Sequence, residues 1–383
     1  MPYARRTIEL PAMTPGTGRG IVYHRFGRAN ARPKAYLQAA IHANELPGAM
    51  ALHHLMPMLA AAQRRGLIRG EIVIVPTVNP IGLSQLVGNN HLGRYDFVGR
   101  ENFNRNWLDL SGAVAERVGR RLGRDAARNV ALIRRAAVDA LAGLRPMNEL
   151  QTLRVEVMKL SIDADVVLDL HCDMEAVLHL FISRQDWPGP AQALAADIGA
   201  AAVLYNDPWP ESLTFSGVNS ALWPRLARLF PEAAIPQACL SATIEYRGQH
   251  DVNHAFGEAD GRNLYRFLVR RGIVSGRAGA LPRAKATATP MEGMDVGYSP
   301  RTGMLVYHAA EGSSVRKGAA VCEVIDPRDP RGPLARVQVA AQTDGILFSR
   351  RPDGRLVWPG SVLFRIAGKQ PLAHRKGMSG LDD

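Results

Sequence analysis

Short apolar runs alternate with longer amphipathic segments through the first 270 residues. Several short runs are apolar throughout, as in strands that are covered on both faces of a sheet. The longer segments repeat apolar residues at helical spacing, and Pro47 fits a first helical turn, where an N–H would have no partner. This alternation predicts an α/β domain with a mostly parallel mixed sheet and helices on both faces. The predicted strands are 20–26, 34–41, 71–76, 165–170, 176–182, 202–205 and 242–246, and the predicted helices are 47–64, 113–143, 147–161, 189–198 and 259–271.

The pattern changes near residue 273, where glycine and proline become frequent. Short strand-like runs separated by turn signals follow, which is typical of a small all-β domain. These runs are 303–308, 320–325, 336–340, 345–349 and 362–366. We therefore expect an α/β domain at 1–272, a linker at 273–290, a small C-terminal all-β domain at 291–370 and a disordered tail at 371–383.

Composition and charge narrow the choice of partners. The chain has 383 residues, of which 46% are hydrophobic and 21% charged, as in ordinary globular proteins, and its formal net charge is +12. Much of the excess is arginine between about 117 and 145, where it alternates with apolar residues at helical spacing. This favours a solvated helix face over a binding surface. Because no nucleic-acid-binding motif is visible, we expect no nucleic-acid partner.

Cysteine and hydropathy patterns bear on location. The cysteines are Cys172, Cys239 and Cys322, an odd number at wide spacing, so no disulfide framework is implied. The first ten residues lack the apolar run of a signal peptide, and no run approaches the ~18 apolar residues of a membrane span. We expect a cytoplasmic protein without a membrane partner, and a homo-oligomer stays possible.

Three polar clusters stand at the ends of predicted strands. His42 and Glu45 follow the strand at 34–41, His171 follows the strand at 165–170, and Glu245 lies within the strand at 242–246. Sites in open α/β sheets form beyond the carboxyl ends of strands, so these clusters could converge. Two histidines and one carboxylate are a common ligand set for catalytic zinc, which lowers the pKa of its water towards ~7. Glu245 is then the candidate general base and acid.

Each of these residues also has a purely structural explanation. A single His-x-x-Glu sequence is a weak signal, and a histidine after an apolar strand is often a hydrogen-bonded structural residue. Asp169 and Asp173 could cap the chain, or one of them could orient His171. Glu245 is harder to dismiss because a buried, unpaired carboxylate is costly, although it could pair with Arg247.

A fourth segment, Asn102-Phe103-Asn104-Arg105-Asn106-Trp107, adds a possible substrate contact. Arginine can hold a carboxylate through two parallel hydrogen bonds, and asparagine offers both a donor and an acceptor. Asn104 and Arg105 are therefore candidates for substrate binding. The alternative is a turn held by asparagine side chains with a solvated arginine.

The order of these motifs resembles the zinc carboxypeptidase superfamily. The succession is His-x-x-Glu, then Asn-Arg-Asn and an aromatic residue, then a histidine at a strand end, then a glutamate in a late strand. Val78-Asn79-Pro80-Ile81-Gly82 is similar to a further loop of that superfamily. The Asn-Phe-Asn-Arg form of the loop, the Glu-Tyr-Arg-Gly run at 245–248 and the added β domain resemble the succinylglutamate desuccinylase/aspartoacylase branch. The β domain itself is similar to barrel-sandwich domains of the biotinyl/lipoyl type, without their Met-Lys attachment site.

The resemblance implies a zinc carboxypeptidase-like fold and one Zn²⁺ on His42, Glu45 and His171. It implies Asn104 and Arg105 at a substrate carboxylate and Glu245 as general base and acid. It also implies an arginine that polarises the carbonyl, for which Arg94 is favoured and Arg100 is the alternative. Arg100 and Arg247 are further candidates for substrate binding.

Together these features predict a zinc-dependent deacylase that hydrolyses the amide bond of an N-acyl amino acid. A zinc carboxypeptidase that acts on peptide C-termini is the second hypothesis, and a β domain that closes over the site would disfavour it. A non-catalytic binding protein on a hydrolase fold is the third. The acyl group and the amino acid are left open.

Overall fold

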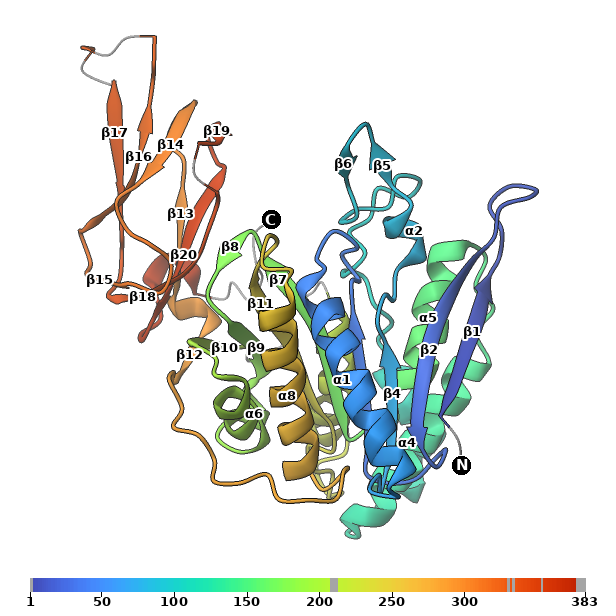
Figure 1. Cartoon of the computed structure of the whole chain (residues 1–383). Helices are drawn as coiled ribbons and strands as arrows, with labels where there is room; N and C mark the ends of the chain where they lie inside the picture. The colour runs from blue at the N-terminus through green and yellow to red at the C-terminus, as the bar shows by residue number, and fades with distance from the viewer. Residues whose placement is uncertain (1–2, 207–212, 329–330, 333–334, 353, 377–383) are drawn as a thin grey trace.

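In the computed structural model, which describes residues 3–206, 213–328, 331–332, 335–352 and 354–376, a large mixed sheet forms the centre of the molecule (Figure 1). Its strand order is β1-β2-β4-β3-β7-β11-β9-β10-β12. β4, β3, β7 and β11 are parallel to one another, as are β9, β10 and β12, while β1–β2, β2–β4 and β11–β9 are antiparallel. The predicted fold class is therefore confirmed. The strands are β1 (Ala4–Leu10), β2 (Arg19–Gly27), β3 (Lys34–Ala39), β4 (Glu71–Val75), β7 (Val166–Asp173), β9 (His179–Ser183), β10 (Ala202–Asn206), β11 (Leu240–Gly248) and β12 (Ala288–Pro290).

Helices cover both faces of this sheet and enclose two hydrophobic cores. α1 (Pro47–Arg64), α6 (Pro190–Ile198) and α8 (His254–Arg270) pack on one face, and α3 (Ser111–Val118), α4 (Ala126–Ala142), α5 (Glu149–Ser161) and α7 (Phe215–Leu229) pack on the other. Successive strand residues point to opposite faces. In β3, Tyr36 therefore joins the core beneath α7, while Leu37 joins the core beneath α1.

The same alternation separates apolar from polar residues in β7 and β11. Leu168, Leu170, Ala242 and Ile244 belong to the core beneath α1. The intervening residues, which include Asp169, His171, Ser241, Thr243 and Glu245, point to the face covered by α7. Because β7 and β11 are neighbours with His171 opposite Glu245, one strip of this face is polar although it is largely enclosed.

The C-terminal part forms two smaller antiparallel sheets, drawn in orange and red in Figure 1. One has the order β13-β20-β18-β15 and the other β17-β16-β14-β19. The short strand β8 (Glu175–Ala176), which follows β7 directly, pairs with β18 and so ties this part to the main domain. The strands are β13 (Met294–Tyr298), β14 (Gly303–Tyr307), β15 (Ser314–Val315), β16 (Ala320–Ile325), β17 (Arg336–Ala340), β18 (Gly345–Arg350), β19 (Leu356–Val357) and β20 (Val362–Gly368).

Two predicted elements are interrupted. The helix expected at 113–143 breaks at Gly119, whose φ is +32°, and restarts after Asp125, which accepts a hydrogen bond from the Arg128 amide as an N-cap. The strand expected at 176–182 divides into β8, which joins the C-terminal part, and β9, which joins the main sheet.

The segments expected as a linker and as a disordered tail both contain some regular structure. The last residues of the segment expected as a linker form β12, which pairs with β10. The start of the segment expected as a tail contains a 3-10 turn at Ala373–Arg375, and the Arg375 side chain is buried. Residues 377–383 lie outside the described part of the chain. Within that part, no helix is long and apolar enough to cross a bilayer.

Candidate functional site

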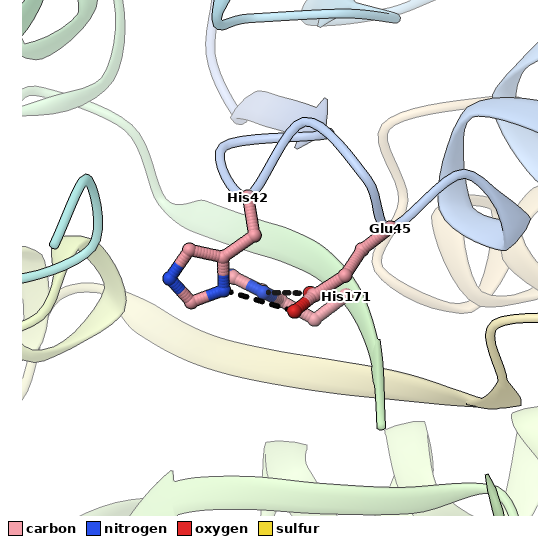
Figure 2. Close-up of side chains that lie close together, drawn as sticks. All are labelled: His42, Glu45 and His171. Carbon is pink, nitrogen blue, oxygen red and sulfur yellow. Dashed lines mark hydrogen bonds and ion pairs between the residues drawn. The ribbon is translucent and has the colours of Figure 1, made fainter. Parts of the chain in front are cut away.

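His42 and Glu45 lie in the short loop that leads from β3 into α1 (Figure 2). Ala40, directly after β3, has a φ of +60°, so the chain turns sharply there. The Glu45 amide donates to the His42 carbonyl at 3.0 Å, and the Ala43 amide donates to Gly93 at 2.8 Å. These bonds hold the loop and direct both side chains towards the end of β7.

His171, the third residue from the C-terminal end of β7, completes the set of predicted metal ligands. The two carboxylate oxygens of Glu45 lie 3.0 Å from Nδ1 of His42 and 2.7 Å from Nδ1 of His171. All three residues are buried, and their ligand atoms lie within 4.8 Å of one another. They form a group that could hold a metal ion.

The outer nitrogen of each imidazole also has an oxygen partner. Nε2 of His42 lies 2.8 Å from Oδ1 of Asn102, and Nε2 of His171 lies 2.9 Å from Oδ2 of Asp169. These oxygens are acceptors, which favours a proton on each Nε2 and leaves the Nδ1 lone pairs facing the Glu45 carboxylate. Two imidazole nitrogens and a carboxylate that converge in this way can share one bound cation, so the group fits a divalent metal.

Charges within this group shift its pKa values in opposite directions. Burial alone would raise the pKa of Glu45, but the imidazoles of His42 and His171 outweigh burial and hold that pKa well below its usual range. Burial alone would lower the pKa of His171, yet Asp169 and Glu45 raise it well above its usual value. The raised pKa of His171 shows that Glu45 and Asp169 concentrate negative charge around it, where a bound cation would be stabilised.

Glu245 lies beside this group on β11, directly opposite His171 in the strand register. Its Oε2 is enclosed and has no hydrogen-bond partner among the described residues. Burial raises the pKa of Glu245 to about 8, and the negative charges of Glu45 and Asp173 act in the same direction. An enclosed carboxyl group with an unused oxygen is suited to exchange protons with a ligand.

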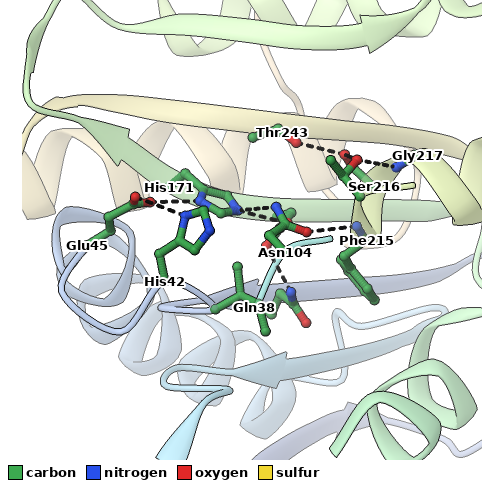
Figure 3. A network of polar contacts seen from close by, with 12 residues as sticks. Gln38, His42, Glu45, Asn104, His171, Phe215, Ser216, Gly217 and Thr243 are labelled. Carbon is green, nitrogen blue, oxygen red and sulfur yellow. Dashed lines mark hydrogen bonds and ion pairs between the residues drawn. The ribbon is translucent and has the colours of Figure 1, made fainter. Parts of the chain in front are cut away.

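Asn104 connects the His-Glu-His group with α7 (Figure 3). Its Nδ2 lies 3.1 Å from Nε2 of His171, and its Oδ1 accepts a hydrogen bond from the Phe215 amide at the start of α7. Arg105 follows it and donates to the Asn104 carbonyl at 3.0 Å. Both residues line the same cavity as the His-Glu-His group.

Of the three other arginine candidates, only Arg94 lies at the cavity. Its Nη1 is 3.1 Å from Glu45 Oε1 and 3.3 Å from His42 Nδ1. Arg100 and Arg247 are not among the lining residues. Arg247 instead forms an ion pair with Asp260 of α8 and packs over the Phe256 ring at 4.2 Å.

The cavity has a volume of about 970 Å³ and includes residues that sequence reasoning missed. The C-terminal sheets contribute Tyr298, Arg351, Trp358 and Arg365, and α7 contributes Ser216, Gly217 and Ser220. Packing between distant segments brings these residues in, so no local motif could have revealed the first set. Ser241 and Thr243 of β11 also line the cavity, and for these the sequence did hold a signal, because polar positions 241, 243 and 245 share one face of a strand.

Comparison with known proteins assigns the family. Residues 31–221 match the succinylglutamate desuccinylase/aspartoacylase catalytic domain. This chain belongs to the succinylglutamate desuccinylase/aspartoacylase family. The predicted resemblance is thereby confirmed, and membership of this family indicates a hydrolase of the deacylase type. The match contains His42, Glu45, Asn104 and His171, whereas Glu245 lies beyond it.

Solved structures share the fold over the whole chain. A protein described as a succinylglutamate desuccinylase/aspartoacylase from Shewanella frigidimarina has a TM-score of 0.82 at 19% identity, covering 97% of this chain and 99% of its own. A family protein from Shewanella amazonensis has a TM-score of 0.82 at 20% identity, covering 96% and 100%. One from Rhodobacter sphaeroides has a TM-score of 0.63 at 16% identity, covering 96% of each chain. No curated protein sequence gives a significant match.

Proposed function

We propose that this family member is a zinc-dependent deacylase that hydrolyses the amide bond of an N-acyl amino acid. The observation that carries the proposal is the convergence of His42, Glu45 and His171 in one cavity with Glu245, Asn104 and Arg105. The cavity thus combines a metal-ligand set, a proton-exchanging carboxyl group and a carboxylate-binding pair.

Zinc suits the ligand set because two imidazoles and one carboxylate leave a fourth coordination position open. When bound, zinc lowers the pKa of a coordinated water and polarises a carbonyl group. His42 and His171 would offer Nδ1, since each Nε2 is held by an oxygen of Asn102 or Asp169.

Asn104 and Arg105 would orient the substrate. The Arg105 guanidinium can bind the carboxylate of the amino-acid part through two parallel hydrogen bonds. Asn104 lies 3.1 Å from the outer nitrogen of His171, so a carboxylate held here lies next to the ligand group. Such an anchor would bring the scissile amide towards the ligand group and Glu245, which line the same cavity.

Glu245 would then exchange the protons. Its carboxylate accepts a proton from the attacking water and delivers it to the leaving nitrogen, as general base and then general acid. A divalent cation nearby favours the ionised form that the first step needs. Arg94, whose Nη1 points at the ligand group, would stabilise the negative charge that develops on the carbonyl oxygen.

The C-terminal sheets support a small substrate over a peptide. Tyr298, Arg351, Trp358 and Arg365 line the same cavity as the ligand group, so this part of the chain limits the space beyond the acyl group. A peptide needs an open groove in which its preceding residues can extend.

The test is an assay of the zinc-loaded protein with N-acetyl and N-succinyl amino acids and with blocked dipeptides that end in the same amino acids. We expect release of the free amine from the acyl amino acids, loss of that activity with a chelator, and its return with zinc. Hydrolysis of the dipeptides alone would instead support a carboxypeptidase. Failure to bind zinc would overturn both.

A further inference from the structure

One arm of the cavity runs away from Glu245 along β11 and beneath α7. Ser241, Thr243 and Glu245 alternate along one face of β11 and all line the cavity. At a rise of ~3.3 Å per residue, Ser241 lies about 13 Å from Glu245. Ser216 and Ser220, one turn apart on α7, lie across from them, and Ser183 of β9 closes the far end beside Ser241. We call these residues, Ser183, Ser216, Ser220, Ser241 and Thr243, the hydroxyl arm.

The hydroxyl arm adjoins the place where the amino-acid part of a substrate would be held. Asn104 Oδ1 accepts from the Phe215 amide, the residue next to Ser216, so the Asn104–Arg105 pair touches the start of α7. Tyr298, Arg351 and Trp358 lie in the C-terminal part, which docks beyond the end of β7. An amino acid anchored by its carboxylate at Arg105 therefore directs its side chain into the hydroxyl arm, while its acyl group extends towards the C-terminal sheets.

The arm holds no cation. Every lysine and arginine of the sequence falls in the described part of the chain, and those that line the cavity are engaged elsewhere. Arg94 contacts Glu45, Arg351 donates to Val362, and Arg365 pairs with Asp173. Arg105 is at the proposed carboxylate anchor. A second carboxylate on the substrate would therefore enter a largely enclosed arm without a positive partner, which is costly.

The hydroxyl groups offer both donors and acceptors. Ser241 donates to the Ser216 carbonyl at 2.8 Å, which leaves its oxygen free to accept. Ser220 accepts from Gln237 at 3.0 Å and is itself fully buried. Thr214, Ser216 and Thr243 share two hydrogen bonds, of 3.4 Å and 2.7 Å, among three hydroxyl groups, so one hydroxyl hydrogen of the three is available. Such a set matches an amide or a hydroxyl group, whereas a carboxylate can use only the donors.

We propose that the hydroxyl arm selects N-acyl amino acids with an uncharged, hydrogen-bonding side chain, such as an amide or a hydroxyl, and rejects acidic ones. This inference rests on the proposed deacylase function. It names Ser216, Ser241 and Thr243 as residues that determine specificity.

The experiment compares kcat/KM of the zinc-loaded protein for the N-acetyl derivatives of asparagine and aspartate, glutamine and glutamate, leucine and lysine. Asparagine and aspartate have nearly the same shape, so their ratio isolates the charge. We expect asparagine to exceed aspartate on the order of 100-fold, and leucine by about 10-fold. A preference for aspartate, glutamate or lysine would overturn the inference while leaving a deacylase in place.

Two variants separate the arm from general effects. Thr243→Val keeps the shape of the side chain and removes its hydroxyl, so the preference for asparagine over leucine should fall several-fold. Thr152→Val, at a half-buried position of α5 that does not line the cavity, should leave that preference unchanged. An unchanged preference in Thr243→Val would contradict the role of the arm.

Calorimetry with the free amino acids tests the arm without turnover. L-asparagine should bind the zinc-loaded protein more tightly than L-aspartate. If no N-acyl amino acid is hydrolysed, the proposed function fails, and this binding ratio alone decides the specificity of the arm. Equal or reversed affinities would overturn it.

Discussion

His171 and Asp169 are joined by a hydrogen bond of 2.9 Å between Nε2 and Oδ2. The second oxygen of Asp169 accepts from Gln38 at 2.8 Å, and Gln38 accepts in turn from the Tyr36 hydroxyl at 2.8 Å. All four residues are buried. A chain of hydrogen bonds across β3 and β7 therefore fixes the imidazole ring of His171 so that its Nδ1 faces Glu45.

Asp169→Asn should weaken zinc binding about 10- to 100-fold, because the substitution removes the charge that orients and polarises His171. The measurement is the zinc dissociation constant, obtained by competition with a chromophoric chelator. Asp139→Asn, on the exposed side of α4, is the control and should leave zinc affinity unchanged. Affinity within twofold of wild type in Asp169→Asn would show that the hydrogen bond has no part in metal binding.

Glu245→Gln should bind zinc normally and lose about 10²- to 10⁴-fold in kcat, since an amide cannot take up the proton of the attacking water. Stopped assays with the best N-acyl amino acid would give kcat, and metal analysis of the same sample would give zinc occupancy. Turnover close to wild type at full occupancy would remove Glu245 from the proposed mechanism.

Much of the candidate site could be predicted because its residues lie at or near the ends of buried strands, and such strands are visible as apolar runs. His42, Glu45, His171 and Glu245 all have this signal. Arg247 does not line the cavity with them because strand alternation fails locally. The register of β11 shifts between Glu245 and Gly248, and Arg247 has a φ of +60°, so its side chain turns towards Asp260 of α8.

Other features depend on packing that the sequence does not display. α7 was not predicted, since Gly217 and Pro224 interrupt its helical pattern. Its position nevertheless follows from contacts with β11, including the bond between Ser216 and Thr243. The C-terminal part reaches the cavity because β8 pairs with β18, and no pattern in the sequence indicates this pairing.

Arg365→Met should lower the free energy of unfolding by about 2 kcal/mol. Arg365 is buried and donates to Asp173 at 3.2 Å across the contact between the C-terminal sheets and β7. Removal of one partner leaves a largely enclosed carboxylate without its cation. Urea denaturation of the zinc-free protein at pH 7 gives the value.

The matched control for this change is Arg336→Met. Arg336 lies 3.9 Å from Glu323 and its side chain is 71% exposed, so its loss should cost less than about 0.5 kcal/mol. Equal effects of the two substitutions would show that the Asp173–Arg365 pair does not stabilise the contact.

Asp186→Asn should stabilise the protein at pH 8 but not at pH 4. Asp186 follows β9, is 2% exposed, and its Oδ2 has no hydrogen-bond partner among the described residues. Burial raises the pKa of this carboxyl group from 3.8 to about 7, with a smaller opposing effect of Arg271. Between these two pH values the folded state retains a proton that the unfolded state has lost, so the wild-type protein loses stability as the pH rises from about 4 to about 7. Asparagine carries no charge at either pH and avoids this loss.

We expect a gain of about 1–3 kcal/mol at pH 8 and almost none at pH 4, measured by urea denaturation at both values. A gain of the same size at both pH values would mean that the substitution acts through packing rather than through ionisation of Asp186.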